Sequence, residues 1–255
     1  MSTTDALPVP GLVIVGARGR MGRRLAALAC EYGLEVAAEV DADGPALDAA
    51  VAARARCVID FSVLAQAPVT LAWAAAHKVP TVLGTTGLGP SEEDALTRAA
   101  LETPVVWAPN FSLGVHVLLE LVAEAARLLD DGWDVELVEA HHRKKVDAPS
   151  GTALALARRV AAARSVGLAE IARHGREGLV GARPRGELGL HAVRGGSVVG
   201  EHAVHFFGEG ELVTLEHRAL DRDIFARGAL RSAAWLVAAD RAPGRYGLGD
   251  VLGSR

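Results

Sequence analysis

The sequence predicts an α/β fold with two domains, a parallel-sheet domain followed by an α+β domain with a mixed or antiparallel sheet. Three observations support this fold class. Short apolar runs alternate with helical patterns up to residue 110, a glycine-rich turn joins the first run to the first helical pattern, and later segments alternate apolar with polar residues. A chain of 255 residues is long enough for one large domain or two modest ones.

The first half repeats a strand–helix unit. Residues 11–16 (GLVIVG) predict a buried strand because the run is short, β-branched and bounded by glycine. Residues 20–32 predict a helix with Met21, Leu25, Leu28 and Ala29 on one face. Further strands are expected at 34–40, 57–60, 79–83 and 105–107, and helices at 45–54, 65–77 and 91–101, the last capped by Ser91. Such units with apolar strands indicate a parallel sheet covered on both faces.

The pattern changes after residue 110. Helices are expected at 113–129 and 151–164, the second starting on Ser150, with a strand at 133–140 between them. Segments 187–194, 197–206 and 212–218 alternate as a half-exposed antiparallel sheet does, and the glycine- and arginine-rich stretch 166–186 predicts a long loop. An apolar helix at 224–239 is expected to pack back on the first domain. We therefore expect one domain from residues 1–112 with 223–255, and a second from 113–222.

Composition argues against several classes of protein. The net charge is −4, whereas binding nucleic acid needs concentrated positive charge. Residues 1–10 lack the pattern of a signal peptide, and the uncharged run 61–76 is too short and too rich in alanine for a membrane span. Cys30 and Cys57 lie in apolar patterns, which favours small buried side chains over a disulfide or a metal pair. We expect a cytoplasmic protein that binds neither nucleic acid nor membrane.

The glycine-rich turn at 16–22 (GARGRMG) has its glycines in a GxxGxxG pattern, whereas the usual dinucleotide-binding pattern is GxGxxG. Glycine still permits a tight turn and the close approach of a pyrophosphate to backbone N–H groups, and Arg18 and Arg20 add positive charge. Asp41 follows the second strand, 19 residues past Gly22, where a carboxylate accepts ribose hydroxyls and repels a 2′-phosphate. This predicts a Rossmann-type site that favours NADH, although Arg20 could accommodate NADPH. The alternative is a turn that only packs a helix on a sheet.

Three further loops follow strands of the same sheet: 60–62 (DFS), 84–87 (GTTG) and 108–112 (APNFS). Ligands of open α/β sheets bind outside the carboxyl ends of the strands. These loops could therefore hold the nicotinamide ribose and amide. For any one of them alone, ordinary turn chemistry is the simpler explanation.

Residues 139–152 (EAHHRKKVDAPSGT) are the most concentrated polar cluster. Ser150 is a natural N-cap, which leaves the N–H groups of Gly151 and Thr152 facing an anion, and a nearby lysine would complete a carboxylate site. Histidine is the side chain best able to donate a proton near neutral pH. The alternatives are a solvated basic loop, a phosphate or RNA patch, which lacks interleaved aromatic residues, and a metal site, which adjacent histidines on an extended chain disfavour.

Four stretches together resemble the 4-hydroxy-tetrahydrodipicolinate reductase family, also called dihydrodipicolinate reductase: 16–22, 84–87, 110–115 (NFSLGV) and 141–152. The stretch from Val193 and Arg194 to His202 is also similar to that family. The resemblance covers residues 11 to 238, and the string HHRKKVDAPSGTA carries most of its specificity.

The resemblance implies a cytoplasmic, usually tetrameric enzyme of the diaminopimelate route to lysine. It would use NADH or NADPH, and no metal, to reduce a cyclic dicarboxylate made from pyruvate and aspartate semialdehyde. His141 would donate the proton and Lys145 would be the cationic partner of the substrate, whose carboxylates would meet His142, Lys145, Ser150, Gly151 and Thr152. The candidate cofactor residues are Gly16, Arg18, Gly19, Arg20, Met21, Asp41, Phe61, Gly84, Thr86, Ala108, Asn110 and Phe111. Residues 1–112 with 223–255 would bind the dinucleotide, and 113–222 the substrate and other subunits.

Two departures from the family pattern leave the cofactor preference open. Arg18 stands where many members have a small residue, and Ala42 where some have an arginine. Two other functions also remain open: a related reductase of another cyclic imine or enamine acid, and a non-catalytic nucleotide-binding protein. The presence of both His141 and Lys145 favours the reductase of the family.

Overall fold

A computed structural model describes residues 10–44 and 46–253. Contacts divide the chain into two units, Met1–Leu113 with Asp223–Arg255, and Gly114–Arg222. Our expectations for the first nine residues, and for a helix beginning at Pro45, lie at least partly outside the described residues. Among the residues that are described, no helix has the length and apolarity needed to cross a membrane.

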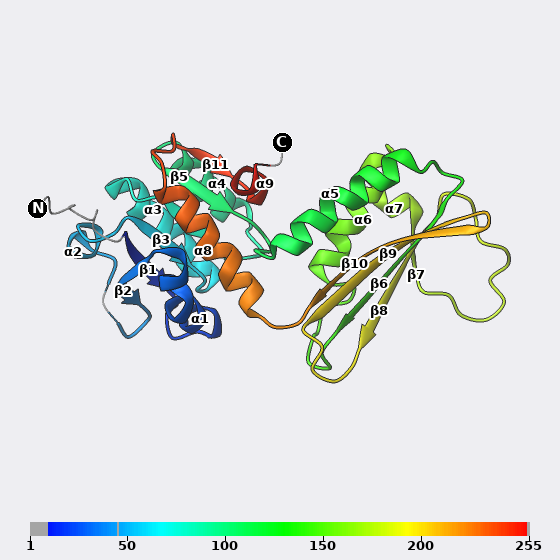
Figure 1. The fold of residues 1–255 in the computed structure, drawn as a ribbon, viewed down its shortest axis with the longest axis horizontal. Coiled ribbons are helices and arrows are strands. Elements are labelled where there is room, and N and C mark those ends of the chain that lie inside the picture. Colours follow the sequence, from blue (N-terminus) through cyan, green and yellow to red (C-terminus); the bar gives the residue numbers. More distant parts are fainter. Residues whose placement is uncertain (1–9, 45, 254–255) are drawn as a thin grey trace, which may run out of the picture. The chain divides into compact units, whose positions relative to one another are not determined.

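The first unit contains a parallel sheet of six strands within the described residues, in the order β11-β5-β4-β3-β1-β2 (Figure 1). Every neighbouring pair in it is parallel. The strands are β1 (Gly11–Val15), β2 (Glu35–Val40), β3 (Cys57–Asp60), β4 (Thr81–Leu83), β5 (Pro104–Trp107) and β11 (Gly244–Tyr246). The predicted parallel sheet is confirmed, and β11 is an edge strand that the sequence did not reveal.

Both faces of this sheet are covered, because alternate residues of its strands point to opposite sides. Leu12 and Ile14 pack with α1 (Arg20–Leu28) and α8 (Asp223–Val237). Val13 and Val15 pack on the other side, with Trp73 of α3 and Val51 of α2. The helices of that side are α2 (Ala49–Ala52), α3 (Ala67–His77) and α4 (Pro90–Ala100). The strands are therefore apolar for the reason that the sequence predicted, which is that helices bury both faces of the sheet.

Several details of this unit differ from expectation. Cys30 is exposed, because it lies in the 3₁₀ turn η1 (Ala29–Tyr32) that follows α1 instead of on the packed helical face, whereas Cys57 is buried as expected. Ser91 does not cap α4. The N-cap is Gly89, whose N–H donates to the Glu92 carboxylate at 2.9 Å, and Pro90 begins the helix. Of the helix expected at 45–54, only the shorter α2 is present among the described residues. Two short elements were not expected: the 3₁₀ turn η2 (Leu64–Gln66) before α3, and the helix α9 (Leu248–Leu252) after β11.

The second unit contains a mixed sheet, in the order β10-β9-β6-β8-β7. The strands are β6 (Asp134–His141), β7 (Ala172–His174), β8 (Leu188–Arg194), β9 (Gly200–Gly208) and β10 (Glu211–Ala219). The expectation of antiparallel pairing for 187–194 is wrong, because β8 is parallel to both β6 and β7, while β9 is antiparallel to β6 and β10.

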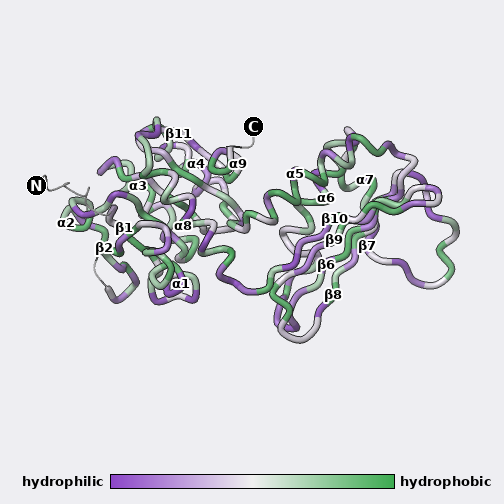
Figure 2. The backbone as a smooth tube through the Cα atoms, in the orientation of Figure 1, coloured by the Kyte–Doolittle hydropathy of each residue, from purple (hydrophilic) through white to green (hydrophobic). Residues whose placement is uncertain are grey.

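Two long helices, α5 (Leu113–Leu128) and α6 (Gly151–Ala163), cover one face of the mixed sheet (Figure 1). The core between them includes Val135, Leu137 and Phe206 from the strands. Hydrophilic and hydrophobic residues intermingle along these strands (Figure 2). This is the pattern of a sheet that buries one face, and it is why the period-two alternation was visible in the sequence.

The stretch 166–186 is only partly a loop, because it holds α7 (Leu168–Ile171) and β7. Its arginines bind the mixed sheet through Glu136. Arg176 donates to the two Glu136 carboxylate oxygens at 2.7 and 3.1 Å, and Arg183 donates to the same carboxylate at 3.0 Å. Nε2 of His191 lies 2.6 Å from Glu136 Oε2. The arginine-rich composition therefore has a structural role, which is to anchor the loop.

This anchor predicts a pH dependence of stability. Burial raises the pKa of Glu136, but hydrogen bonds from Arg176, His191 and Arg183 outweigh it and lower the pKa to about 2. The folded value lies below the ordinary 4.5, so the stabilisation is present above pH 4.5 and is lost as pH falls towards 2. We expect Glu136→Gln to be less stable than wild type at neutral pH, and the difference to shrink below pH 4.5 in thermal melts. A constant difference between the two proteins would contradict this.

Candidate active site

The glycine-rich turn after β1 has a backbone that only glycine fits at two positions. Gly16 has φ +80°, and its N–H donates to Val40 O at 2.9 Å. A Cβ on Gly22 would lie 2.2 Å from Gly16 O and 2.5 Å from Ala17 Cα. The first and third glycines therefore let α1 begin directly against the end of β1.

The N-terminus of α1 fits the pyrophosphate of a dinucleotide. Its N-cap is Gly19, and no side chain among the described residues caps the helix. The first-turn N–H groups of a helix with such an end face an anion readily. Arg18 and Arg20 are exposed beside it, and the Arg18 guanidinium lies 3.9 Å from Asp43. The half-buried Met21 packs against the core beneath the turn.

Asp41 lies beside this turn, as the prediction of a ribose-binding acid requires. Its Oδ2 accepts the N–H of Arg18 at 2.8 Å, and its Oδ1 accepts the N–H of Ala42 at 2.9 Å. These backbone hydrogen bonds lower the pKa of Asp41, which keeps the carboxylate ionised. The residues present therefore fit both the phosphate and the adenosine ribose of a nicotinamide dinucleotide.

The loops after β3, β4 and β5 lie at the same edge of the sheet. The Phe61 ring covers Gly84, where an added Cβ would lie 2.4 Å from ring carbons, and the rings of Phe61 and Phe111 are 5.6 Å apart. The Asn110 side-chain oxygen accepts the N–H of Ser112 at 2.8 Å. Thr86 is exposed, whereas Ala108 and Phe111 have 6% and 2% of their surface exposed. Ala108 and Phe111 therefore offer a cofactor only their backbone.

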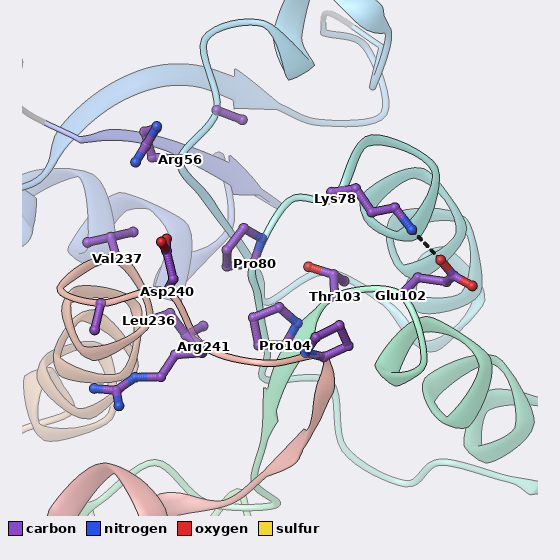
Figure 3. Close-up of a pocket in the computed structure, with 13 residues that line it drawn as sticks. Arg56, Lys78, Pro80, Glu102, Thr103, Pro104, Leu236, Val237, Asp240 and Arg241 are labelled. Carbon is purple, nitrogen blue, oxygen red and sulfur yellow. Dashed lines mark hydrogen bonds and ion pairs between the residues drawn. The ribbon is translucent and has the colours of Figure 1, made fainter.

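A cavity of about 340 Å³ opens at the opposite edge of this sheet (Figure 3). It is lined by residues that precede or begin β3, β4 and β5, among them Arg56, Pro80 and Thr103, and by the end of α8. Lys78 and Glu102 form an ion pair at its rim (Figure 3). Because the glycine-rich turn lies at the carboxyl ends of the strands, this cavity is separate from the expected dinucleotide site.

In the second unit, the polar cluster is organised by Glu139, which has 1% of its surface exposed. Glu139 and His141 are two residues apart near the carboxyl end of β6, so their side chains share the face that bears the helices. Glu139 Oε2 lies 2.6 Å from Nδ1 of His141, and Oε1 accepts the N–H of Ser150 at 3.0 Å. Arg194 of β8 donates to both carboxylate oxygens at 2.7 Å.

His141 has one ring nitrogen engaged and one without a partner. Nε2 makes no hydrogen bond to any described residue, and 12% of the side chain is exposed. Burial lowers the pKa of His141; Glu139 raises it, and the charges of Lys145 and Arg194 lower it further, so the net shift is downward. At neutral pH the free protein therefore holds His141 mainly in its neutral form.

His202 of β9 stands behind this histidine. The two rings meet edge to face at 5.1 Å, and Nε2 of His202 lies 3.0 Å from Ser150 Oγ. Burial, together with the nearby charge of His141, lowers the pKa of His202 to about 4. His202 is consequently a neutral hydrogen-bonding partner of the N-cap at physiological pH.

The residues predicted to bind carboxylates lie at the start of α6 and in the loop before it. Ser150 is its N-cap, with Oγ accepting the N–H of Ala153 at 3.1 Å, and a Cβ on Gly151 would meet no atom within 4 Å. Lys145 Nζ lies 2.9 Å from Asp147, in the loop before this helix. Nδ1 of His142 is buried without a hydrogen-bond partner in the described part of the chain. The Ser150 cap is thus confirmed.

The structure therefore brings together three of the predicted residues, His141, Lys145 and Ser150, in one charged cluster. Sequence reasoning missed the roles of Glu139, Arg194 and His202. Part of the signal was present, since Glu139 begins the polar cluster at 139–152 and Arg194 and His202 lie in a stretch similar to the reductase family. Nothing in the sequence showed that Glu139 and Arg194 pair.

The first unit has a Rossmann-type sheet whose glycine turn fits a dinucleotide, and the second has a cluster with a histidine, a lysine and a buried glutamate. Together they define the class of a nicotinamide-dependent oxidoreductase of a small molecule. The family model for the N-terminus of dihydrodipicolinate reductase matches residues 11–111 of the chain. The family model for the C-terminus of dihydrodipicolinate reductase matches residues 114–252. The chain belongs to the dihydrodipicolinate reductase family.

Named relatives agree over nearly the whole chain. The 4-hydroxy-tetrahydrodipicolinate reductase of Caulobacter vibrioides is 45% identical, covering 95% of this chain and 96% of its own. That of Dinoroseobacter shibae is 43% identical, covering 96% and 98%. Dipicolinate-bound dihydrodipicolinate reductase from Paenisporosarcina sp. TG-14 has the same fold, with a TM-score of 0.77 at 24% identity over 95% of this chain and 99% of that one.

These matches confirm the resemblance seen in the sequence. The protein is an NAD(P)H-dependent oxidoreductase with a reductase role in lysine biosynthesis, and its substrate is a small molecule.

Proposed function

We propose that the protein reduces 4-hydroxy-tetrahydrodipicolinate to tetrahydrodipicolinate. A hydride and the proton from Nε2 of His141 are added, and the 4-hydroxyl group of the substrate leaves as water. One observation carries this assignment. Nδ1 of His141 is held by Glu139 while Nε2 has no partner among the described residues. A histidine fixed through one nitrogen and open at the other is suited to exchange a proton with a bound molecule.

The carboxylates of the substrate would meet Lys145, His142 and the start of α6 at Ser150, Gly151 and Thr152. Lysine supplies a positive charge, and the helix start supplies oriented donors, so both carboxylates can be held without rearrangement. Negative charge bound beside His141 also favours its protonated form. Substrate binding therefore charges the histidine that acts as the acid, although burial keeps it neutral in the free protein.

The first unit would hold the dinucleotide through Gly16, Gly19, Arg20 and Met21 at the turn, and through the loops of Phe61, Gly84, Thr86 and Asn110. When bound, the reduced nicotinamide supplies the hydride. Asp41 favours NADH, because its ionised carboxylate accepts ribose hydroxyls and repels a 2′-phosphate.

Replacing Asp41 tests this preference. We expect Asp41→Ala to weaken NADH binding about tenfold, the size of a lost hydrogen bond to a charged group, and to leave NADPH binding unchanged or improved. Titration of nicotinamide fluorescence measures both dissociation constants. Asp43→Ala, which removes a neighbouring exposed acid, is the control. Equal weakening of the two nucleotides would remove Asp41 from the ribose role.

The reaction itself is tested by oxidation of NADH and NADPH with substrate generated freshly from pyruvate and aspartate semialdehyde by a coupled synthase. We expect turnover with at least one nucleotide. Tight nucleotide binding without turnover would favour a non-catalytic protein, and turnover restricted to another cyclic imine would favour a related reductase.

The protein is further proposed to be a cytoplasmic homotetramer. The family resemblance supports both the location and the tetramer. The face of the mixed sheet opposite Val135 and Leu137 supports an assembly of subunits. There Val193, Phe207 and Leu212 share one side by strand register and have 52%, 42% and 51% of their surface exposed. Exposed apolar side chains gathered on one face are typical of subunit contacts. Light scattering during gel filtration tests the assembly, and a monomer at micromolar concentration would contradict it.

A further inference from the structure

We infer that Glu139 is a positioning residue for the proton donor. Its carboxylate holds the proton of the neutral His141 ring on Nδ1, which makes Nε2 the reacting nitrogen, and Arg194 balances the charge of that carboxylate. The inference rests on the proposed role of His141 and adds two residues, Glu139 and Arg194, to the functional machinery.

The geometry leaves the Glu139 carboxylate no freedom to turn. Arg194 donates to both oxygens at 2.7 Å. The Ser150 N–H lies 3.0 Å from Oε1, and Nδ1 of His141 lies 2.6 Å from Oε2. A two-pronged guanidinium contact of this kind fixes orientation as well as distance. The carboxylate therefore determines where the His141 ring lies.

An ionised carboxylate accepts hydrogen bonds and donates none, so Nδ1 of His141 must carry a hydrogen. Burial raises the pKa of Glu139, but hydrogen bonds from Arg194, His141 and the Ser150 N–H outweigh it, and the net shift is downward. Glu139 is thus ionised at neutral pH. Proton exchange between the neutral and charged forms of His141 then takes place at Nε2.

The environment of Nε2 supports the same assignment independently. A Cβ added at Gly200 of β9 would lie 3.0 Å from Nε2 of His141. The strand therefore presents bare backbone beside this nitrogen, and no side chain of residue 200 competes for the space. Together with the absence of any partner for Nε2 among the described residues, this leaves the nitrogen open to a ligand.

The charges around His141 explain why two residues are needed. The ring faces Glu139 on its own strand, Arg194 on β8, Lys145 in the following loop and His202 on β9. Glu139 is the anion of this group, so without it the protonated ring would face two cations. Without Arg194, the unbalanced carboxylate would hold the proton too strongly for transfer. Arg194 also donates to Asp147 O at 2.7 Å, which ties the Lys145 loop to the same carboxylate.

The test uses opposite changes in charge. We expect Glu139→Gln to lower the pKa of His141 and Arg194→Met to raise it, as followed by NMR titration of the ring nitrogens in the full-length protein without ligands. Nitrogen shifts of the neutral ring should report Nδ1–H in wild type and lose that preference in Glu139→Gln. We also expect kcat to fall about 10- to 100-fold in Glu139→Gln with nucleotide affinity unchanged, the size expected when a residue that orients a working side chain is removed.

Control variants separate positioning from general damage. Glu136→Gln changes another carboxylate of β6 and should leave the His141 titration unchanged. Glu139→Asp keeps the charge, and we expect it to retain Nδ1–H and to recover part of kcat. If Glu139→Gln does not fold, two measurements still test the inference. They are the rise in the pKa of His141 in Arg194→Met and the retention of the Nδ1–H form of the His141 ring in Glu139→Asp.

The inference would be overturned if the pKa of His141 shifted in the same direction in Glu139→Gln and Arg194→Met, or if it shifted in neither. The titration does not depend on turnover, so it also separates this inference from the proposed function. Opposite shifts combined with an unchanged kcat in His141→Gln would uphold the positioning of the ring and reject His141 as the acid.

Discussion

Replacing His141 with glutamine is expected to lower kcat by about 10²- to 10⁴-fold, the usual contribution of a general acid. Glutamine has similar polarity but cannot deliver a proton near neutral pH, so the loss falls on turnover. The dissociation constant of the nucleotide should not change, because the residues expected to bind it belong to the other unit. Steady-state kinetics and nucleotide titration on the same preparation measure the two effects separately.

His174→Gln is the matched control for this replacement, because His174 is exposed on the short strand β7. We expect it to retain the kcat of wild type. A His141→Gln variant that also keeps full turnover would remove His141 from the acid role, whatever its effect on affinity.

The pH dependence follows from the same assignment. The acid acts in its protonated form, so the rate falls as pH rises through the pKa of His141. In the free protein this pKa lies below its ordinary value, mainly because the ring is buried, and it rises when the substrate carboxylates bind. The profile of kcat/KM, which reports the free protein, should therefore fall at lower pH than that of kcat. Two results would contradict this: kcat/KM and kcat falling at the same pH, or the fall with rising pH persisting in His141→Gln.

Replacing Lys145 with methionine is expected to lower kcat/KM by about 10- to 100-fold. A hydrogen bond to a charged group is worth about 1.5–3 kcal/mol, and methionine keeps the length of the side chain without its charge. The Lys145 side chain is 21% exposed and lies near Asp147 in the loop before α6. We expect most of the loss to appear in KM, since the contact is made to a carboxylate that does not react.

Lys144→Met provides an adjacent control, because Lys144 is exposed. The two variants have the same change of net charge, so a difference between them reports position and not overall electrostatics. Equal effects from both would indicate a diffuse attraction of the basic loop instead of a defined contact with Lys145.

The fold of the first unit was largely readable from the sequence, because its signals are local. The run at 57–60 is β3 residue for residue, and the cap at Ser150 is where the residue type and spacing placed it. The errors occur where local signals are weak or ambiguous. Serine at 91 was a plausible cap, but Pro90 favours the first helical position and moves the cap to Gly89.

Short edge elements were missed for a different reason. β7 and β11 have three residues each, too few for a period to be recognised, and each is defined by pairing with a longer strand, β8 and β5 respectively. Their existence depends on an open sheet edge supplied by another part of the chain. No pattern within three residues encodes that edge.

The sequence by itself determined the parallel sheet, the glycine turn with its acid, and the string that holds His141, Lys145 and Ser150. Each of these rests on residues close together in the chain, where spacing and chemistry act directly. The tertiary structure alone decided the surroundings of the proton donor. Glu139 and Arg194 are 55 residues apart and meet because β6 and β8 lie parallel with His141 paired to Arg194. Charge balance around a buried histidine depends on such pairings, which follow from strand register and not from local sequence.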